Sequence, residues 1–162
     1  MCTYIFFAQH EGLVMNAKAD KYSQLPDCSC NMIRRSARRI TQFYENTLRE
    51  AGIKPTQFTI LAALANTGPV QLTQLADKLL LERTGLTRNL NVLERNGWVR
   101  VETGEEDSRQ RIVSLTEEGY VQLDNAIPYW QKAQTKLVNE MGQDRITELQ
   151  TSLDDMSKAI TS

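Results

Sequence analysis

The stretch that decides the fold is ERTGLTRNLNVLERNG, which runs from Glu82 to Gly97. Leu86, Leu90 and Leu93 recur at i, i+4 and i+7, and this spacing predicts a helix with one apolar face turned toward a core. The opposite face collects polar side chains: Thr84, Thr87, Arg88, Asn91 and Arg95. Arginine pairs with guanine, asparagine with adenine, and threonine contacts a thymine methyl or a phosphate. The pattern therefore fits a helix that reads DNA, and it also fits an ordinary solvated helix.

The flanking segments favour the first interpretation. Two β-rich runs, Trp98–Glu102 and Arg111–Leu115, are joined by a charged turn and predict a β-hairpin. Before the reading helix, the segment Leu72–Leu80 predicts a short amphipathic helix with Leu72, Leu75, Ala76 and Leu79 turned inward. Helix, tight turn, helix and hairpin in this order predict a helix-turn-helix with a wing.

Three segments carry a resemblance to the MarR family of bacterial winged-helix transcription regulators. They are PTQFTILAALA (Pro55–Ala65), LTQLADKLLLERTGLTRNLNVLERNGWV (Leu72–Val99) and the wing sequence DSRQRIVSLTEEG (Asp107–Gly119). Together they span roughly the middle half of the chain, in the order and spacing of the family. The resemblance implies a cytoplasmic, homodimeric repressor of a palindromic double-stranded DNA operator, released by a small-molecule or oxidant signal.

We therefore expect a mainly α (α+β) fold, a winged helix-turn-helix with long N- and C-terminal dimerisation helices. The expected segments are an N-terminal extension (1–24), an N-terminal dimerisation helix (25–55), the DNA-binding domain (56–116) and C-terminal dimerisation helices (117–162). Glu11-Gly12 can be encoded by a ribosome-binding core just before Met15, so we expect the physiological product to start at Met15.

The terminal segments read as long amphipathic helices. We expect one helix over Asp27–Ala51, and on it Arg34, Arg35, Arg38 and Arg39 form either a solvated face or a phosphate-facing patch. A second should start at Thr116 as N-cap and bend at Pro128. The last, Asp144–Ile160, repeats its apolar residues in the 3-4-3-4 spacing of a coiled-coil seam. In the resembling family the first and last helices of two chains form the dimer.

The resemblance also implies roles for individual residues. The side chains expected in the major groove are Arg83, Thr84, Thr87, Arg88 and Asn91. Arg109 and Arg111 of the wing are expected to reach the minor groove. Asp107, the aspartate of the family's D-x-R motif, is expected to hold an arginine in place.

Composition excludes several other classes of protein. The net charge is −1, so any affinity for nucleic acid must come from local basic residues. The chain shows no apolar run of the roughly 20 residues that a membrane helix needs. It also shows no phosphate-binding glycine loop and no Cys/His metal spacing. We therefore expect no enzyme, cofactor or metal. Two alternatives to a DNA-binding regulator stay open: a winged-helix protein-interaction module without DNA binding, and a thiol-redox enzyme built on Cys28 and Cys30.

Two interpretations of the sensed signal stay open as well. In the hydroperoxide-sensing branch of the resembling family, Cys30 falls on the reactive cysteine and Tyr44 on a tyrosine that the branch uses. Cys28 stands beside it, and Cys30 at a helix start favours a thiolate, although both cysteines also fit a structural role. Alternatively, a ligand pocket for a small aromatic acid would use aromatic residues with Arg34 or Arg38 as the anion partner. The aromatic candidates, which equally fit a core, are Phe43, Tyr44, Trp98, Tyr129 and Trp130.

Overall fold

The structure, a computed structural model, describes residues 28–104 and 107–161. The expected N-terminal extension, the proposed start at Met15, and the wing residues Glu105 and Glu106 lie outside these ranges. The chain divides into two units, Met1–Thr41 and Gln42–Ser162. Helix α2, Ser29–Leu48, runs from the first unit into the second.

The first long helix ends in a tightened turn. After Leu48 the backbone continues as a 3-10 helix over Arg49–Ala51, and Gly52 closes it in the left-handed conformation with φ 70°. The helix expected over Asp27–Ala51 is thus confirmed in outline, with its last turn 3-10 in place of α. Such tightening satisfies carbonyl groups that an α-helix leaves unpaired at its end.

Three helices of the second unit surround a leucine-rich core: α3 (Pro55–Thr67), α4 (Leu72–Leu79) and α5 (Arg83–Arg95). Their large, fully buried side chains are Ile60, Leu61, Leu64, Leu75, Leu86, Leu90 and Leu93. In α4 and α5 these side chains come from the apolar stripe that the helical period predicts, whereas α3 is apolar along most of its length and its period did not single out Ile60.

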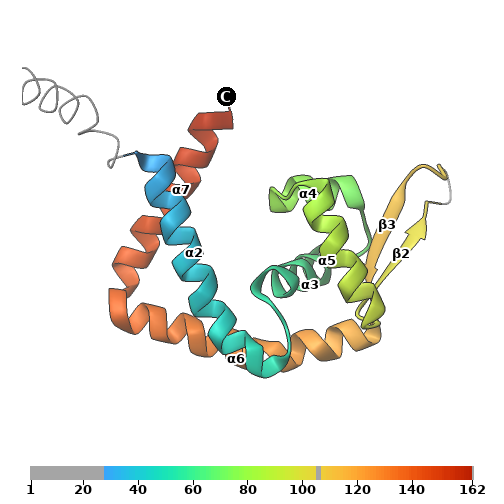
Figure 1. The fold of residues 1–162 in the computed structure, drawn as a ribbon, viewed down its shortest axis with the longest axis horizontal. Coiled ribbons are helices and arrows are strands. Elements are labelled where there is room, and N and C mark those ends of the chain that lie inside the picture. Colours follow the sequence, from blue (N-terminus) through green and yellow to red (C-terminus); the bar gives the residue numbers. More distant parts are fainter. Residues whose placement is uncertain (1–27, 105–106, 162) are drawn as a thin grey trace, which may run out of the picture. The chain divides into compact units, whose positions relative to one another are not determined.

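The hairpin is present, and a third strand joins it. Strands β2 (Val99–Thr103) and β3 (Arg111–Leu115) pair antiparallel, and the short β1 (Val70–Gln71) adds to the other edge of β3. Val113 at the middle of β3 faces Val70 on one side and Val101 on the other, and it is fully buried. Figure 1 shows the hairpin extending beyond α5, as a wing does. The expected wing is confirmed.

Helix α6, Glu117–Met141, begins at the residue expected to cap it. The Thr116 Oγ1 atom accepts a hydrogen bond from the Gly119 backbone N–H at 3.0 Å. The helix continues through Pro128, which leaves the carbonyl one turn earlier without its usual donor. The bend expected there stays a prediction.

The last helix, α7 (Gln143–Thr161), follows Gly142, whose φ of 85° favours glycine. Of its apolar stripe only Ile146 is buried. Leu149 is 46% exposed, Leu153 39% and Ile160 78%. The fold class is confirmed, a mainly helical winged helix-turn-helix, whereas the segment boundaries of the dimerisation helices stay predictions. Within the described ranges, no helix combines the length and the hydrophobicity that crossing a bilayer requires.

Candidate DNA-binding site

Helix α5 has two faces of opposite character. Leu86, Leu90 and Leu93 are at most 2% exposed and anchor the helix to the core. Because they share one stripe, the side chains on the other stripe must point to solvent. The residues expected in the major groove are all exposed: Arg83, Thr84, Thr87, Arg88 and Asn91. The structure therefore places the residues proposed to read DNA on one exposed surface of α5, as the sequence pattern predicts.

Two side chains of α5 bond to their own helix, which limits what they can offer DNA. Thr87 Oγ1 donates to the Arg83 carbonyl at 2.8 Å, so its proton is engaged while its methyl group stays free. Arg95 Nε donates to the Asn91 carbonyl at 3.1 Å, which folds this guanidinium back along the last turn. Thr87 is thus suited to an apolar contact with a base, such as a thymine methyl.

Asp107 shapes the turn at the tip of the wing. Its Oδ1 accepts a hydrogen bond from the Arg109 backbone N–H at 2.9 Å, and its carbonyl accepts one from Gln110 at 2.9 Å. Gly104 closes the turn by donating to the Gln110 carbonyl at 3.0 Å. The structural role expected of Asp107 thus acts on the backbone of a wing arginine, and the Arg109 side chain is left exposed at the tip.

Arg111 lies lower on the wing than Arg109. Its Nη1 donates to Thr103 Oγ1 at 3.1 Å, across the pair of the β2–β3 register that lies next to the turn. Arg100 and Glu102 approach within 4.0 Å on the same hairpin, at a distance and exposure where an ion pair contributes little. Arg111 is therefore partly engaged within the hairpin, whereas Arg109 projects from its end.

Sequence reasoning missed a contact between the wing and the helix-turn-helix. Gln71 Nε2 donates to Gln110 Oε1 at 2.8 Å, although the two residues stand 39 positions apart. Gln71 directly precedes α4, and Gln110 belongs to the wing turn held by Asp107. This bond ties the angle of the wing to the start of α4. Two isolated glutamines carry no periodic signal by which the sequence could have paired them.

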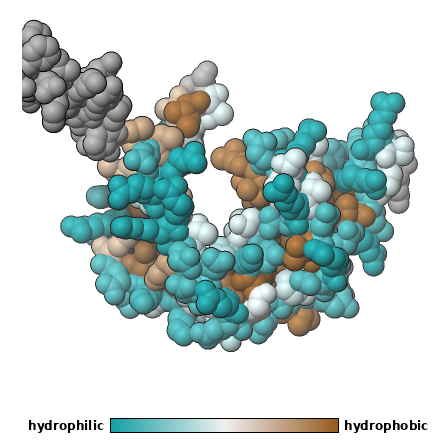
Figure 2. Space-filling view, viewed as in Figure 1, coloured by the Kyte–Doolittle hydropathy of each residue, from teal (hydrophilic) through white to brown (hydrophobic). Residues whose placement is uncertain are grey.

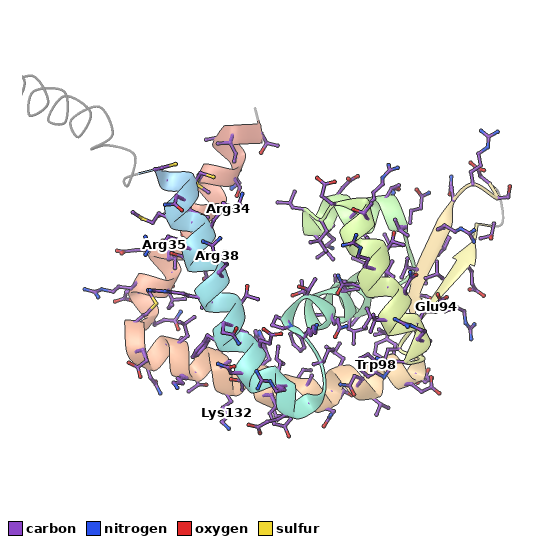
Figure 3. All side chains as sticks on the ribbon, in the orientation of Figure 1. Arg34, Arg35, Arg38, Glu94, Trp98 and Lys132 are labelled. Carbon is purple, nitrogen blue, oxygen red and sulfur yellow. The ribbon has the colours of Figure 1, made fainter. Side chains whose placement is uncertain are left out.

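The base of the wing is fixed to α6. The Trp98 carbonyl accepts from the Thr116 N–H at 3.2 Å, and Thr116 Oγ1 donates to the Gly97 carbonyl at 2.6 Å. Figure 3 shows Trp98 at the foot of the hairpin, beside α6. Since Gly97 ends the turn after α5, one hydroxyl joins the end of the reading helix to the start of α6.

Several aromatic candidates for a ligand pocket contribute to the core. Trp98, Tyr129 and Trp130 are half-buried and pack against the buried cluster, and Trp130 stacks on Phe58 with ring centroids 6.0 Å apart. This packing favours the core interpretation that the sequence left open for them. Their part in a pocket stays a prediction.

Phe43 and Tyr44 lie together against α6, and Tyr44 also packs against the buried core cluster. Their rings meet edge to face at 5.6 Å, and Lys136 Nζ lies 5.8 Å from the centre of the Phe43 ring. Tyr44 donates its hydroxyl proton to Gln134 Oε1 at 2.7 Å, and burial raises the pKa of this phenol above its usual value. Phe43 and Tyr44 thus combine apolar surface, a cation and an amide.

The cysteine candidates lie at the start of α2. The thiols of Cys28 and Cys30 are both exposed. Figure 3 shows Arg34, Arg35 and Arg38 projecting from the same helix. Arg34 follows Cys30 by about one helical turn. An oxidant in solution can reach both sulfur atoms.

Comparison with known proteins agrees with this architecture. A model of the MarR family matches residues 51–110, which hold the helix-turn-helix and most of the wing. The crystal structure of the M. tuberculosis transcriptional regulator MosR in complex with DNA is 35% identical in sequence. The match covers 82% of this chain and 98% of that one, with a TM-score of 0.71. The chain belongs to the MarR family.

Two further matches agree with this family assignment. The HTH-type transcriptional regulator YkoM of Bacillus subtilis is 34% identical over 101 residues, 60% of this chain, and the match spans just under two thirds of YkoM, 66%. A MarR variant from E. coli complexed with operator DNA shares the fold at 21% identity and a TM-score of 0.71, over 78% of this chain and 91% of that one. The relatives are transcriptional regulators and not enzymes. The function class of this MarR-family chain is that of a DNA-binding transcriptional regulator.

Proposed function

We propose that the protein is a homodimeric repressor that binds a palindromic DNA operator and releases it on a small-molecule or oxidant signal. The observation that carries the proposal is the face of α5. Its buried leucine row holds Arg88 and Asn91 outward, next to a wing tipped by Arg109. Two copies of α5 would enter successive major grooves, about 34–36 Å apart.

The roles of the reading residues follow from their chemistry. Arg88 and Asn91 lie mid-helix and are suited to bidentate contacts with guanine and adenine. Arg83 and Thr84 begin the helix, where backbone N–H groups also attract a phosphate. Arg109 would insert into the flanking minor groove, and a contact there mainly positions the protein.

The exposed stripe of α7 supports the homodimer. Leu149, Leu153 and Ile160 lie on one helix and face solvent in the isolated chain. A row of large apolar side chains left uncovered marks an interaction surface. The spacing along α7 is that of a helical seam, so a helix of a second copy fits it.

Selection of DNA by the protein itself tests the proposal. Duplexes would be enriched from a random library, and the binding of the best sequence measured at several salt concentrations. We expect a two-fold symmetric site, a footprint over two successive major grooves, and affinity that falls steeply as salt rises. A protein-interaction module without DNA binding would enrich no sequence.

Two signals compete for the release step, and a different observation supports each. The group formed by Phe43, Tyr44 and Lys136 supports an aromatic carboxylate, because it offers apolar rings beside a cation. The exposed thiol of Cys30 supports a peroxide. In that case the thiolate attacks one peroxide oxygen, the O–O bond breaks, and sulfenic acid and an alcohol or water result. A dithiol would reduce the sulfenic acid back to the thiol, itself becoming a disulfide and releasing water.

One experiment separates the two signals. Operator binding of the wild type and of Cys30→Ser would be titrated with hydroperoxide and, separately, with a salicylate-like acid. Peroxide release of the wild type alone, reversed by dithiothreitol, supports the thiol sensor. Release of both proteins by the acid, and of neither by peroxide, supports the pocket. A ligand acts only through its different affinity for the two states, so the acid must bind the DNA-free form more tightly.

A further inference from the structure

Leu80 is unusual in two independent respects. It has φ 50° and ψ 40°, and among the described residues it is the one non-glycine residue with positive φ. Its side chain is also 84% exposed, more than any other large hydrophobic side chain in the described part of the chain. The left-handed conformation is disfavoured for residues with a β-carbon, and glycine or asparagine usually occupies it.

The turn explains the backbone but not the side chain. Leu81 N–H donates to the Ala76 carbonyl at 2.9 Å, and Leu80 N–H to the Asp77 carbonyl at 3.2 Å. These bonds end α4 and reverse the chain into α5, so residue 80 must be left-handed. Glycine would meet that demand without steric strain. A leucine here is strained and buries little of its own surface, so its presence calls for another role.

The side chain of Leu80 faces the same hollow as the start of the reading helix. Leu80, Glu82, Arg83 and Thr84 line one open depression of about 510 Å³. Figure 2 shows a hydrophobic patch where the chain turns from α4 into α5. The patch therefore continues the surface that carries the first two reading residues.

We propose that Leu80 is a specificity-determining residue whose side chain packs on the methyl group of a thymine in the major groove. The inference rests on the proposed function of α5. A duplex that reaches Arg83 and Thr84 also reaches the depression that they share with Leu80. Asp77 and Glu82 line that depression as well, so a phosphate is disfavoured against Leu80 and is left to Arg83 and the backbone N–H groups that begin α5. The apolar group that the major groove offers is the thymine methyl.

Removal of single methyl groups from the DNA tests the contact. Each thymine of the selected operator would be replaced in turn by uracil, which lacks only the methyl. The wild type should lose affinity about fourfold at one symmetry-related thymine that Leu80 contacts, the value expected for one buried methyl. Leu80→Gly and Leu80→Asn, which both tolerate the left-handed turn, should bind the thymine operator more weakly and should not respond to uracil at that position.

Two controls keep the result specific. Val121→Ala removes another exposed apolar side chain, 70% exposed on α6, and should keep the response to uracil. The melting temperature of Leu80→Gly should not fall below that of the wild type, because glycine relieves the strained φ. A melting temperature that stays level while affinity drops assigns the loss to the missing side chain.

The outcomes distinguish this inference from the proposed function. A wild type that enriches no duplex overturns the proposed function and, with it, this contact. A wild type that binds its operator no better than Leu80→Gly and Leu80→Asn overturns the contact alone, and assigns the patch to something other than DNA. Variants that bind more weakly but respond to uracil like the wild type assign Leu80 to the sugar-phosphate backbone and also overturn the base contact.

Discussion

A β-carbon placed on Gly119 would lie 2.0 Å from the carbonyl oxygen of Trp98. The first turn of α6 therefore passes the base of the wing at a distance that only glycine allows. The Trp98 carbonyl oxygen also accepts a hydrogen bond from the Thr116 N–H, at 3.2 Å. The wing and α6 are fitted together through backbone atoms, which cannot move aside as a flexible side chain can.

Gly119→Ala should destabilise the protein by about 3 kcal/mol, the upper range for overpacking. For a chain of this size that lowers the melting temperature by roughly 6–12 °C. Gly85→Ala in α5 is the matched control, since a β-carbon there meets nothing within 4 Å. The control should melt no lower than the wild type, because alanine favours helix. Equal melting temperatures for Gly119→Ala and the wild type would contradict the close approach.

Arg88→Ala should weaken operator binding by about 1–3 kcal/mol and relax the preference at one base pair, if Arg88 pairs with guanine through two hydrogen bonds. The measurement is affinity for the operator and for its single-base variants. Gln74→Ala, an exposed position on α4, serves as the control for a surface change in the same unit. An unchanged sequence preference would remove Arg88 from the reading set.

Arg109→Ala should reduce affinity about equally for all operator variants. Since each neutralised phosphate contributes about 0.9 to the slope of log K against log salt, the slope should flatten by about that amount per protomer. Ser108→Ala, also exposed and in the same turn, changes no charge and should keep the slope. A slope identical to that of the wild type would show that the wing arginine does not reach DNA.

Leu153→Asp should convert the dimer into monomer or aggregate and abolish operator binding. A carboxylate in an apolar seam loses hydration without gaining a partner, at a cost of several kcal/mol. Val121→Asp places the same charge on the exposed face of α6 and should leave the dimer intact. Sedimentation measures both. A dimeric, DNA-binding Leu153→Asp protein would place the seam elsewhere.

Tyr44→Phe should lower the free energy of unfolding by about 0.5–1.5 kcal/mol at neutral pH, because it removes the hydroxyl that donates a hydrogen bond to Gln134. Burial raises the pKa of Tyr44 in the folded state, so the unfolded chain releases the phenol proton first as pH rises. The free energy of unfolding that Tyr44 contributes is therefore fully present below about pH 10, the pKa of a tyrosine in the unfolded chain. It is lost as the pH rises through the higher pKa of Tyr44 in the folded protein. Urea unfolding from about pH 8 to pH 11 should show a smaller decline for Tyr44→Phe than for the wild type.

The parts of the fold that could be predicted are those encoded by residues close together in the sequence. The leucine row of α5 repeats with the helical period, so its burial and the exposure of Arg88 followed from spacing alone. Thr116 ahead of two glutamates is a helix start, and the capping bond is present. The wing followed from two β-rich runs around a charged turn.

The rest depends on contacts that spacing does not encode. The Gln71–Gln110 bond joins residues far apart in sequence, and neither has a pattern that names its partner. The left-handed Leu80 escaped prediction because the usual signal there is glycine or asparagine. Among the aromatic residues, helical spacing is the same for a core and for a pocket. Their packing in the structure, such as that of Trp130 on Phe58, shows which side chains contribute to the core.

The hydroxyl of Thr116 connects the end of α5 to the start of α6 through two hydrogen bonds. It holds the Gly97 carbonyl, where the turn after α5 ends, and the Gly119 N–H, where α6 begins. A tilt of α6 must therefore carry the end of α5 with it or break a bond of 2.6 Å. Any event that displaces α6 would therefore shift the end of α5, and a ligand that holds α5 in place would resist the displacement of α6 equally, as linkage requires. If the proposed signal acts by displacing α6, the Thr116 hydroxyl therefore couples the binding of that signal to the binding of the operator.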